Sequence, residues 1–293
     1  MHISVNLCII IQIDMRIVIA QNSKKEIEKS VYEKFCAYAA DYGISVSFAV
    51  DCFELKERLS TDEYDCVAIF GGDGSMLGFA PVCSEYGVAI LSINMGRVGF
   101  LSQLELKDLQ NGLKMLSKGD FSTEERGMLR LCDGENEFFA LNDIVFCNRM
   151  RSGTISLNLF VDEHFVDRYV GDGLIVSTPT GSTAYSLAAG GPIIYPDLNV
   201  TLLTPLCAHS LRRCPIVVSS DCKISVEYFD NTQCLADGRV LTLSDTEKNT
   251  EKNKVYIERS PNKVKFIRFK TSDFFAKLFE KFASWSNPYM EDK

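Results

Sequence analysis

The hydrophobic and polar positions follow two different patterns, which change near residue 121. Before that point, short runs rich in β-branched residues predict four buried strands, at 15–20, 44–50, 64–70 and 88–94. Between them, apolar residues at helical spacing predict amphipathic helices, at 24–42, 75–86 and 104–116. Strands that alternate with helices are typical of a parallel sheet, so we expect an α/β domain over residues 1–120.

After residue 121 the pattern consists of strand-like runs alone. They lie at 127–132, 137–147, 154–161, 164–170, 174–177, 216–218, 224–229 and 255–257. We therefore expect an all-β domain over residues 121–271. A C-terminal helix is predicted over 272–293, docked on the body through an apolar stripe of Phe274, Phe275, Leu278, Phe279 and Phe282.

A glycine-rich turn follows the third predicted strand and precedes a helix. Residues 71–74 read Gly-Gly-Asp-Gly. Backbone N–H groups in such a turn and at a helix N-terminus form a donor surface for phosphates. Asp73 would be repelled by phosphates there, unless a cation intervenes or its carboxylate takes a proton from an attacking hydroxyl. The alternative is a tight turn in which Asp73 caps the helix.

Two further segments carry polar side chains where stability alone does not require them. Hydroxyls and glycines are concentrated in residues 171–194, and a helix is predicted over 183–189. Tyr185 in this segment offers an aromatic face to a nucleobase; the alternative is a helix with surplus capping residues. Asn142 and Asp143 interrupt an apolar stretch, so they are either paired in the interior or face a ligand. Their side chains suit an adenine edge and ribose hydroxyls.

Composition limits the partners. Hydrophobic residues make up 46% and charged residues 24%, as in a globular protein. The net charge is −8, which disfavours nucleic acid and anionic membranes as partners. The 11 cysteines form no CxxC pair and the 3 histidines lie far apart. This usage predicts a cytoplasmic protein with reduced thiols and no metal cluster of its own.

Six segments in order resemble the ATP-dependent NAD kinases of the bacterial type: 71–74, 94–101, 141–143, 171–194, 204–211 and 237–238. The Gly-Gly-Asp-Gly turn is shared with phosphofructokinases and with diacylglycerol and sphingosine kinases, whereas the run 172–194 is specific to NAD kinases. Three positions depart from the family pattern. Ser75 replaces a frequent Thr, Val170 a frequent Arg, and Arg239 a frequent Gln.

The resemblance implies an active site in the cleft between the two domains of a homodimer or homotetramer. The implied reaction uses ATP, with Mg²⁺ or another divalent cation bound to it, to phosphorylate the 2′-hydroxyl of the adenosine ribose of NAD. Asp73 would be the proton acceptor, and Gly71, Gly72 and Ser75 would hold phosphates. The implied NAD contacts are Gly74, Phe100, Asn142, Asp143, Asp172, Thr180, Thr183, Ala184, Tyr185, Ser186, His209 and Arg239.

Three other functions remain open at the level of sequence. A lipid kinase would present an apolar channel or a basic membrane face. A phosphofructokinase would cluster basic side chains around a sugar phosphate. A dinucleotide sensor without catalysis would keep the binding residues, but the presence of Asp73 disfavours it.

Overall fold

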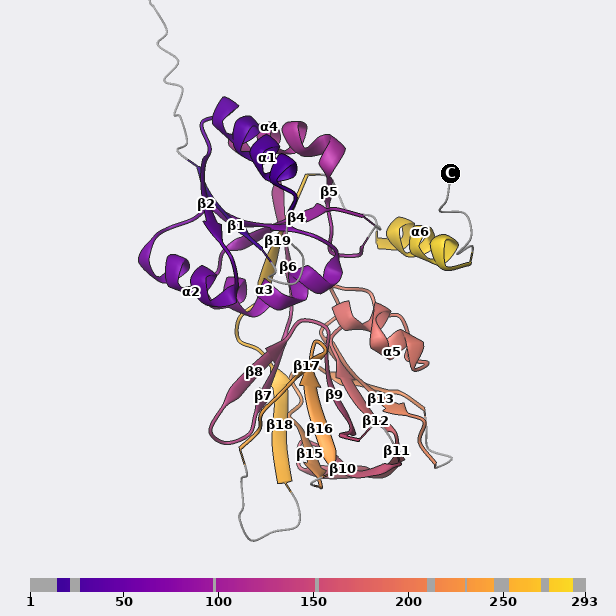
Figure 1. The fold of residues 1–293 in the computed structure, drawn as a ribbon. Helices are drawn as coiled ribbons and strands as arrows, with labels where there is room; N and C mark the ends of the chain where they lie inside the picture. The colour runs from indigo at the N-terminus through magenta and orange to yellow at the C-terminus, as the bar shows by residue number, and fades with distance from the viewer. Residues whose placement is uncertain are drawn as a thin grey trace, which may run out of the picture.

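The computed structural model describes residues 15–21, 27–96, 99–150, 153–209, 214–229, 231–244, 253–269 and 274–286. Two lobes lie one above the other, with the C-terminal helix beside their junction (Figure 1). An α/β domain and an all-β domain were predicted, and this fold class is confirmed. No helix among these residues is long and apolar enough to cross a membrane.

The first lobe is built on a seven-stranded sheet with the order β2-β1-β3-β4-β19-β6, in which β5 pairs with β4. Its N-terminal strands are β1 (Arg16–Ala20), β2 (Ser45–Ala49), β3 (Cys66–Phe70), β4 (Ala89–Asn94) and β5 (Leu104–Glu105). These strands run parallel to one another where they pair. Every residue of β3 and β4 is buried, because helices cover both faces of the sheet.

Four helices cover this sheet: α1 (Lys29–Asp41) and α4 (Leu109–Ser117) on one face, α2 (Cys52–Thr61) and α3 (Asp73–Glu85) on the other (Figure 1). The sequence did not predict α2. Only Leu55 and Leu59 of α2 are buried, so its apolar period is short, but the Asp51 carboxylate caps it by accepting the Glu54 N–H at 2.8 Å.

Two other helix predictions need correction. The helix expected over 24–42 begins at Lys29 in the described part, and residues 22–26 lie outside it. The helix expected over 104–116 starts as the short strand β5, continues as a 3₁₀ turn (Leu106–Asp108), and becomes helical at Leu109. Leu104 is drawn into the sheet because it pairs with Ile93 of β4.

The second lobe consists of two six-stranded sheets with the orders β11-β10-β15-β18-β7-β8 and β14-β13-β12-β9-β16-β17. All their pairings are antiparallel, and one core lies between them, containing Phe146, Leu157 and Val226. The strands of the first sheet are β7 (Leu129–Cys132), β8 (Glu137–Ala140), β10 (Ile155–Val161), β11 (His164–Gly171), β15 (Ile224–Tyr228) and β18 (Asn253–Arg259). Those of the second are β9 (Asp143–Asn148), β12 (Gly173–Ser177), β13 (Val200–Leu206), β14 (Ile216–Ser219), β16 (Thr232–Ala236) and β17 (Arg239–Val240).

The boundary expected near residue 121 differs from the structure. Residues 122–126 and 264–268 were placed in the all-β domain without a predicted strand. They form β6 (Ser122–Arg126) and β19 (Val264–Arg268), and both strands are hydrogen-bonded into the sheet of the first lobe. β19 lies between β4 and β6, and its Phe266 pairs with Ile90 and is fully buried. The chain therefore returns to the first lobe after completing the second, which a local apolar pattern does not reveal.

Helix α6 (Phe274–Ser286), drawn in yellow in Figure 1, follows β19 and packs beside the lobe junction. The Phe274 ring contacts Tyr195 at 5.5 Å and Phe100 at 6.3 Å between centroids, and Leu278 is buried. Phe275 and Phe279 of the predicted stripe are 56% and 69% exposed. The stripe thus docks only in part, and residues 287–293 of the predicted helix lie outside the description.

Candidate active site

Asp73 is the first residue of α3, directly after the turn that ends β3. One oxygen of its carboxylate accepts the Phe100 N–H at 3.0 Å and the other accepts the Leu101 N–H at 3.1 Å. The Nζ of Lys281, from α6, lies 3.4 Å from Oδ2 of Asp73. The N-cap of α3 is Gly72, so Asp73 does not cap the helix and the alternative of a capping residue is not supported.

The glycine turn is shaped by close packing. Gly71 has φ +138°, and a Cβ atom there would lie 2.4 Å from the Ser75 hydroxyl oxygen. A Cβ atom at Gly99 would lie 2.0 Å from Oδ1 of Asp73, so glycine lets the 99–101 segment approach the carboxylate. The Gly71 N–H donates to the Ile93 carbonyl at 2.9 Å. That N–H is therefore already hydrogen-bonded within the protein, and the phosphate contacts expected of Gly71, Gly72 and Ser75 stay predictions.

Asp73 faces a cavity of about 630 Å³ that is lined by both lobes and by α6. Five predicted site residues besides Asp73 line it: Phe100, Asn142, Thr180, Thr183 and Ala184. Lys281 and Phe282 of α6 complete the wall together with Leu101, Leu187 and Ala188. Among the lining residues, Asp73 carries the one carboxylate and Lys281 the one ammonium group.

The segment Leu141–Asp143 is held by a buried carboxylate. Asp237 accepts the backbone N–H groups of Leu141, Asn142 and Asp143 at 2.8, 2.8 and 3.2 Å. The sequence placed Asn142 and Asp143 within one strand, whereas Asn142 lies in the break between β8 and β9, which belong to different sheets. This break turns Asn142 toward the cavity.

Asp143 itself is buried and does not line the cavity. Burial, and then the nearby Asp237 charge, raise the pKa of Asp143 to about 7. Burial also raises the pKa of Asp237, against the lowering effect of its three backbone donors. Burial and mutual repulsion therefore favour a proton on the Asp143–Asp237 pair near neutral pH, and this reduces the negative charge beside the cavity.

Thr178 fixes the segment that carries Thr180, Thr183 and Ala184. Its hydroxyl donates to the Leu141 carbonyl at 2.6 Å and accepts the Gly181 N–H at 3.1 Å. A Cβ atom at Gly181 would lie 2.1 Å from the Asn142 carbonyl oxygen, so the two segments touch through backbone. The helix expected over 183–189 is a 3₁₀ turn (Thr180–Thr183) followed by the short α5 (Tyr185–Ala188).

Several predicted NAD contacts lie outside the Asp73 cavity. Ser186 is fully buried, and its hydroxyl is 2.9 Å from that of Thr204, which leaves its side chain turned inward. Tyr185 is 48% exposed. The other exposed residues of this group are Gly74, Asp172, His209 and Arg239. Their binding roles remain predictions.

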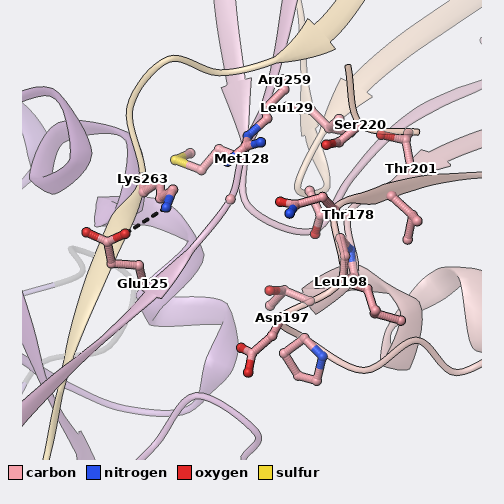
Figure 2. Close-up of a pocket in the computed structure, with 16 residues that line it drawn as sticks. Glu125, Met128, Leu129, Thr178, Asp197, Leu198, Thr201, Ser220, Arg259 and Lys263 are labelled. Atoms are coloured by element: carbon pink, nitrogen blue, oxygen red, sulfur yellow. Dashed lines mark hydrogen bonds and ion pairs between the residues drawn. The ribbon is translucent and has the colours of Figure 1, made fainter. Parts of the chain in front are cut away.

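A different cavity, of about 240 Å³, lies between β6, β7 and the loop 196–199 (Figure 2). It shares Thr180 with the Asp73 cavity but reaches neither Asp73 nor Asn142. Its Lys263 and Glu125 form an ion pair at 2.7 Å. Among the described residues, no three His, Cys, Asp or Glu side chains gather to hold a metal ion.

Sequence reasoning missed the contribution of α6. The C-terminal segment was interpreted through its aromatic stripe, whereas its lysines at 277 and 281 approach the loop 100–102 and Asp73. The one local signal was their spacing of four residues, which places both on the same helix face. The partner 208 residues away could not be identified from that spacing.

Both lobes of this chain are similar to known proteins. Family models of the ATP-NAD kinase N-terminal domain and C-terminal domain match residues 10–121 and 141–269. The NAD kinase of Clostridium botulinum (strain ATCC 19397 / Type A) is 37% identical over 262 residues, which cover 87% of this chain and 91% of that protein. The NAD kinase of Desulforamulus reducens is 35% identical over 286 residues, covering 92% and 97%.

Solved structures show the same architecture. The crystal structure of an NAD kinase from Archaeoglobus fulgidus in complex with ATP matches with a TM-score of 0.76 and 27% identity, covering 92% of this chain and 99% of that one. Yeast NADH kinase shares the fold with a TM-score of 0.76 at 19% identity, covering 96% and 91%. From the two family models, the relatives and the shared architecture, we conclude that this chain belongs to the ATP-NAD kinase family.

Proposed function

We propose that this chain transfers the terminal phosphoryl group of ATP to the 2′-hydroxyl of the adenosine ribose of NAD, giving ADP and NADP. The observation that carries the proposal is the placement of Asp73. Two backbone N–H groups hold its carboxylate in a cavity that Asn142 and Thr183 line from the other lobe. The similar Archaeoglobus enzyme was crystallised with ATP, which supports ATP as the donor.

Asp73 would accept the proton of the 2′-hydroxyl as the new O–P bond forms and the bond to the leaving ADP oxygen breaks. The proton then resides on the carboxylate, and the negative charge moves to ADP. Phosphoryl transfer needs positioning and charge stabilisation more than covalent help from the protein. The N–H groups of Gly72 and Gly74 at the start of α3 suit the donor phosphates, since the first N–H groups of a helix have no intrahelical partner.

A divalent cation such as Mg²⁺ would enter with ATP and be held mainly by the phosphates. Asp73 supplies the one carboxylate among the described residues that line the cavity, so these residues offer no cage of carboxylate ligands. When bound, the cation neutralises charge on the phosphates.

The first test is an assay with NAD, ATP and Mg²⁺, in which NADP is measured by a dehydrogenase specific for NADP. We expect Asp73→Asn to lower kcat by about 10²–10⁴-fold, the usual contribution of a general base. The change also removes one backbone hydrogen bond, which costs on the order of 1 kcal/mol of stability. Calorimetry should therefore still show NAD binding to a folded variant.

The matched control is Asp62→Asn, which removes a carboxylate paired with Arg16 at the end of α2. Its kcat should equal that of the wild type. Unchanged turnover in a folded Asp73→Asn variant would refute the role of Asp73. Binding of NAD by the wild type without any NADP would instead favour a dinucleotide sensor.

Removal of divalent cations should separate activity from folding. We expect EDTA to abolish NADP formation and added Mg²⁺ to restore it, because the cation belongs to the ATP complex. The melting temperature of the protein without nucleotide should stay the same within error. A fall in melting temperature on chelation would show that the protein holds a structural metal, contrary to this proposal.

We further propose that the chain acts as a cytoplasmic homodimer or homotetramer. The exposed position of Asp172, outside the Asp73 cavity, suits a contact with NAD bound to a neighbouring copy. The thiols of Cys207 and Cys214 are exposed and form no disulfide among the described residues, as in a reducing compartment. Light scattering on the purified protein tests the assembly, and a monomeric mass at assay concentration would contradict it.

A further inference from the structure

Beside the Asp73 cavity lies a second cavity, of about 310 Å³, whose wall carries three basic side chains: Arg126, Arg268 and Lys277. The two cavities share Phe100, Leu101, Thr180 and Thr183 as lining residues, so they are neighbours across a common wall. The same wall carries two carboxylates, Glu124 and Asp197, so three cations face two anions in a chain whose net charge is −8.

Two of these cations, Arg126 and Arg268, come from strands in the sheet of the first lobe. Alternate residues of a strand point to the same face, so Glu124 and Arg126 of β6 lie on one face and Glu125 on the other. Glu125 pairs with Lys263 in the cavity of Figure 2. Arg268 ends β19 beside Ser122, on the face of Glu124 and Arg126.

The carboxylates present do not balance these cations. Glu124 forms ion pairs with both Arg126 and Arg268. The side chains of the two arginines are only 9% and 3% exposed. Even so, Nε of Arg126 and Nη2 of Arg268 have no hydrogen-bond partner among the described residues. A buried donor of a charged group that lacks a partner costs free energy, so these two N–H groups are available to bind an anion.

Lys277 adds a third cation from α6. Its Nζ donates to the backbone carbonyls of Ser102 at 3.2 Å and Phe100 at 3.5 Å. Burial, and then the Arg268 charge, lower the pKa of Lys277 to about 8. The other charges that act on it are Glu124, Asp73 and Arg126, while Asp197 is exposed and also lines the cavity.

We propose that the cavity walled by Arg126, Arg268 and Lys277 binds phosphate groups of the donor nucleoside triphosphate. Guanidinium and ammonium groups are the usual partners of phosphate oxygens. The phosphate chain would extend from this cavity past Phe100 and Thr183, which line both cavities, so that the terminal phosphate reaches Asp73 and the N–H groups of Gly72 and Gly74. The nucleotide as source of the phosphates rests on the proposed function, whereas the preference for a phosphate chain rests on the cation cluster itself.

The test uses the full chain and inorganic triphosphate as the probe, so that it does not depend on turnover. Calorimetry should show triphosphate binding to the wild type. Lys277→Met, which removes the charge and keeps the length of the side chain, should weaken binding by about tenfold or more, as for the loss of a charge-assisted hydrogen bond. Lys277→Arg should retain most of the affinity.

Lys114→Met is the matched control, because it removes one exposed lysine from α4 and leaves the cavity intact. It should bind triphosphate as the wild type does. Proton uptake gives a second readout. An anion favours the charged form of Lys277, so binding near pH 8.5 should take up protons in the wild type and in Lys114→Met, but not in Lys277→Met.

Competition identifies the source of the phosphates. ATP should displace triphosphate from the wild type. Simultaneous binding of ATP and triphosphate would overturn the assignment to the donor. Equal triphosphate affinity in the wild type and in folded Lys277→Met would overturn the site itself. Failure of the proposed function would appear differently: triphosphate would bind and depend on Lys277, yet no NADP would form.

Discussion

Asp143 shows how a single buried carboxyl group links the site to pH. Its position beside Asp237 is fixed by backbone N–H groups, and it has little access to water. The two carboxylates cannot both ionise there without repulsion and loss of hydration. The sequence identified Asn142 and Asp143 as out of place in an apolar stretch, but the charge that faces Asp143 comes from a residue 94 positions away.

This environment predicts the sign of a pH effect on stability. A carboxyl group whose pKa is raised from 3.8 to about 7 on folding binds more protons when folded, so it favours folding below pH 4 and that contribution is lost as the pH rises through 7. Asp143→Asn removes this loss. Between pH 5 and pH 8, the unfolding free energy of the wild type should therefore fall by on the order of 2–4 kcal/mol more than that of the variant.

Denaturant titrations at both pH values measure the effect. Asp108→Asn, which removes an exposed carboxylate of the first lobe, should follow the wild type. Parallel pH profiles for Asp143→Asn and the wild type would contradict the buried charge pair.

At the scale of elements, the helices and strands with a strong local period were foreseen, and those held by distant partners were not. β3, α3 and β4 follow the predicted ranges within two residues. The two-residue β5 and the 3₁₀ turn Thr180–Thr183 were not predicted, because Leu104 is held by Ile93 and the 178–184 segment by Leu141. Helix α6 was predicted, but its contribution to the cavity was not.

Docking of α6 depends on a few side chains, which allows a matched comparison on one helix. Phe274 packs on Tyr195 and Phe100, whereas Phe279 is 69% exposed. We expect Phe274→Ala to speed hydrogen exchange of α6 and to lower kcat/KM at least tenfold, since Lys277 and Lys281 move with the helix. Phe279→Ala should change neither. Fast exchange of α6 with full activity would show that the helix is dispensable for the site.

At the scale of the whole molecule, the two lobes are interleaved along the chain. The sheet of the first lobe is completed by β6 and β19, which flank the entire second lobe in sequence. The buried Phe266 and Val264 of β19 belong to the core of the first lobe. The first lobe is therefore not encoded by a continuous stretch of chain.

This arrangement predicts how fragments fold. A fragment of residues 15–121 lacks β6 and β19 and exposes the part of β4 around Ile90 that β19 covers, while β5 still pairs with Ile93 and Asn94. We therefore expect no cooperative melt by circular dichroism. Arg126 and Val264 are antiparallel partners, so residues 15–126 can be joined to 264–269 by an Asn-Gly turn. We expect this joined fragment to melt cooperatively. Cooperative melting of 15–121 alone would contradict the role given to β19.

The sequence by itself determined the fold class, the glycine turn that presents Asp73, and the family, because each depends on periodicity or on motifs within about 25 residues. Only the tertiary structure showed that β6 and β19 belong to the sheet of the first lobe and that the Gly71 N–H is hydrogen-bonded to the Ile93 carbonyl. It also showed that α6 lines the Asp73 cavity. These features depend on contacts such as Lys281 with Asp73, 208 residues apart, or Arg268 with Glu124, 144 apart. Local pattern carries no information on such pairs, because many buried partners satisfy the same apolar period and packing of the whole chain selects one of them.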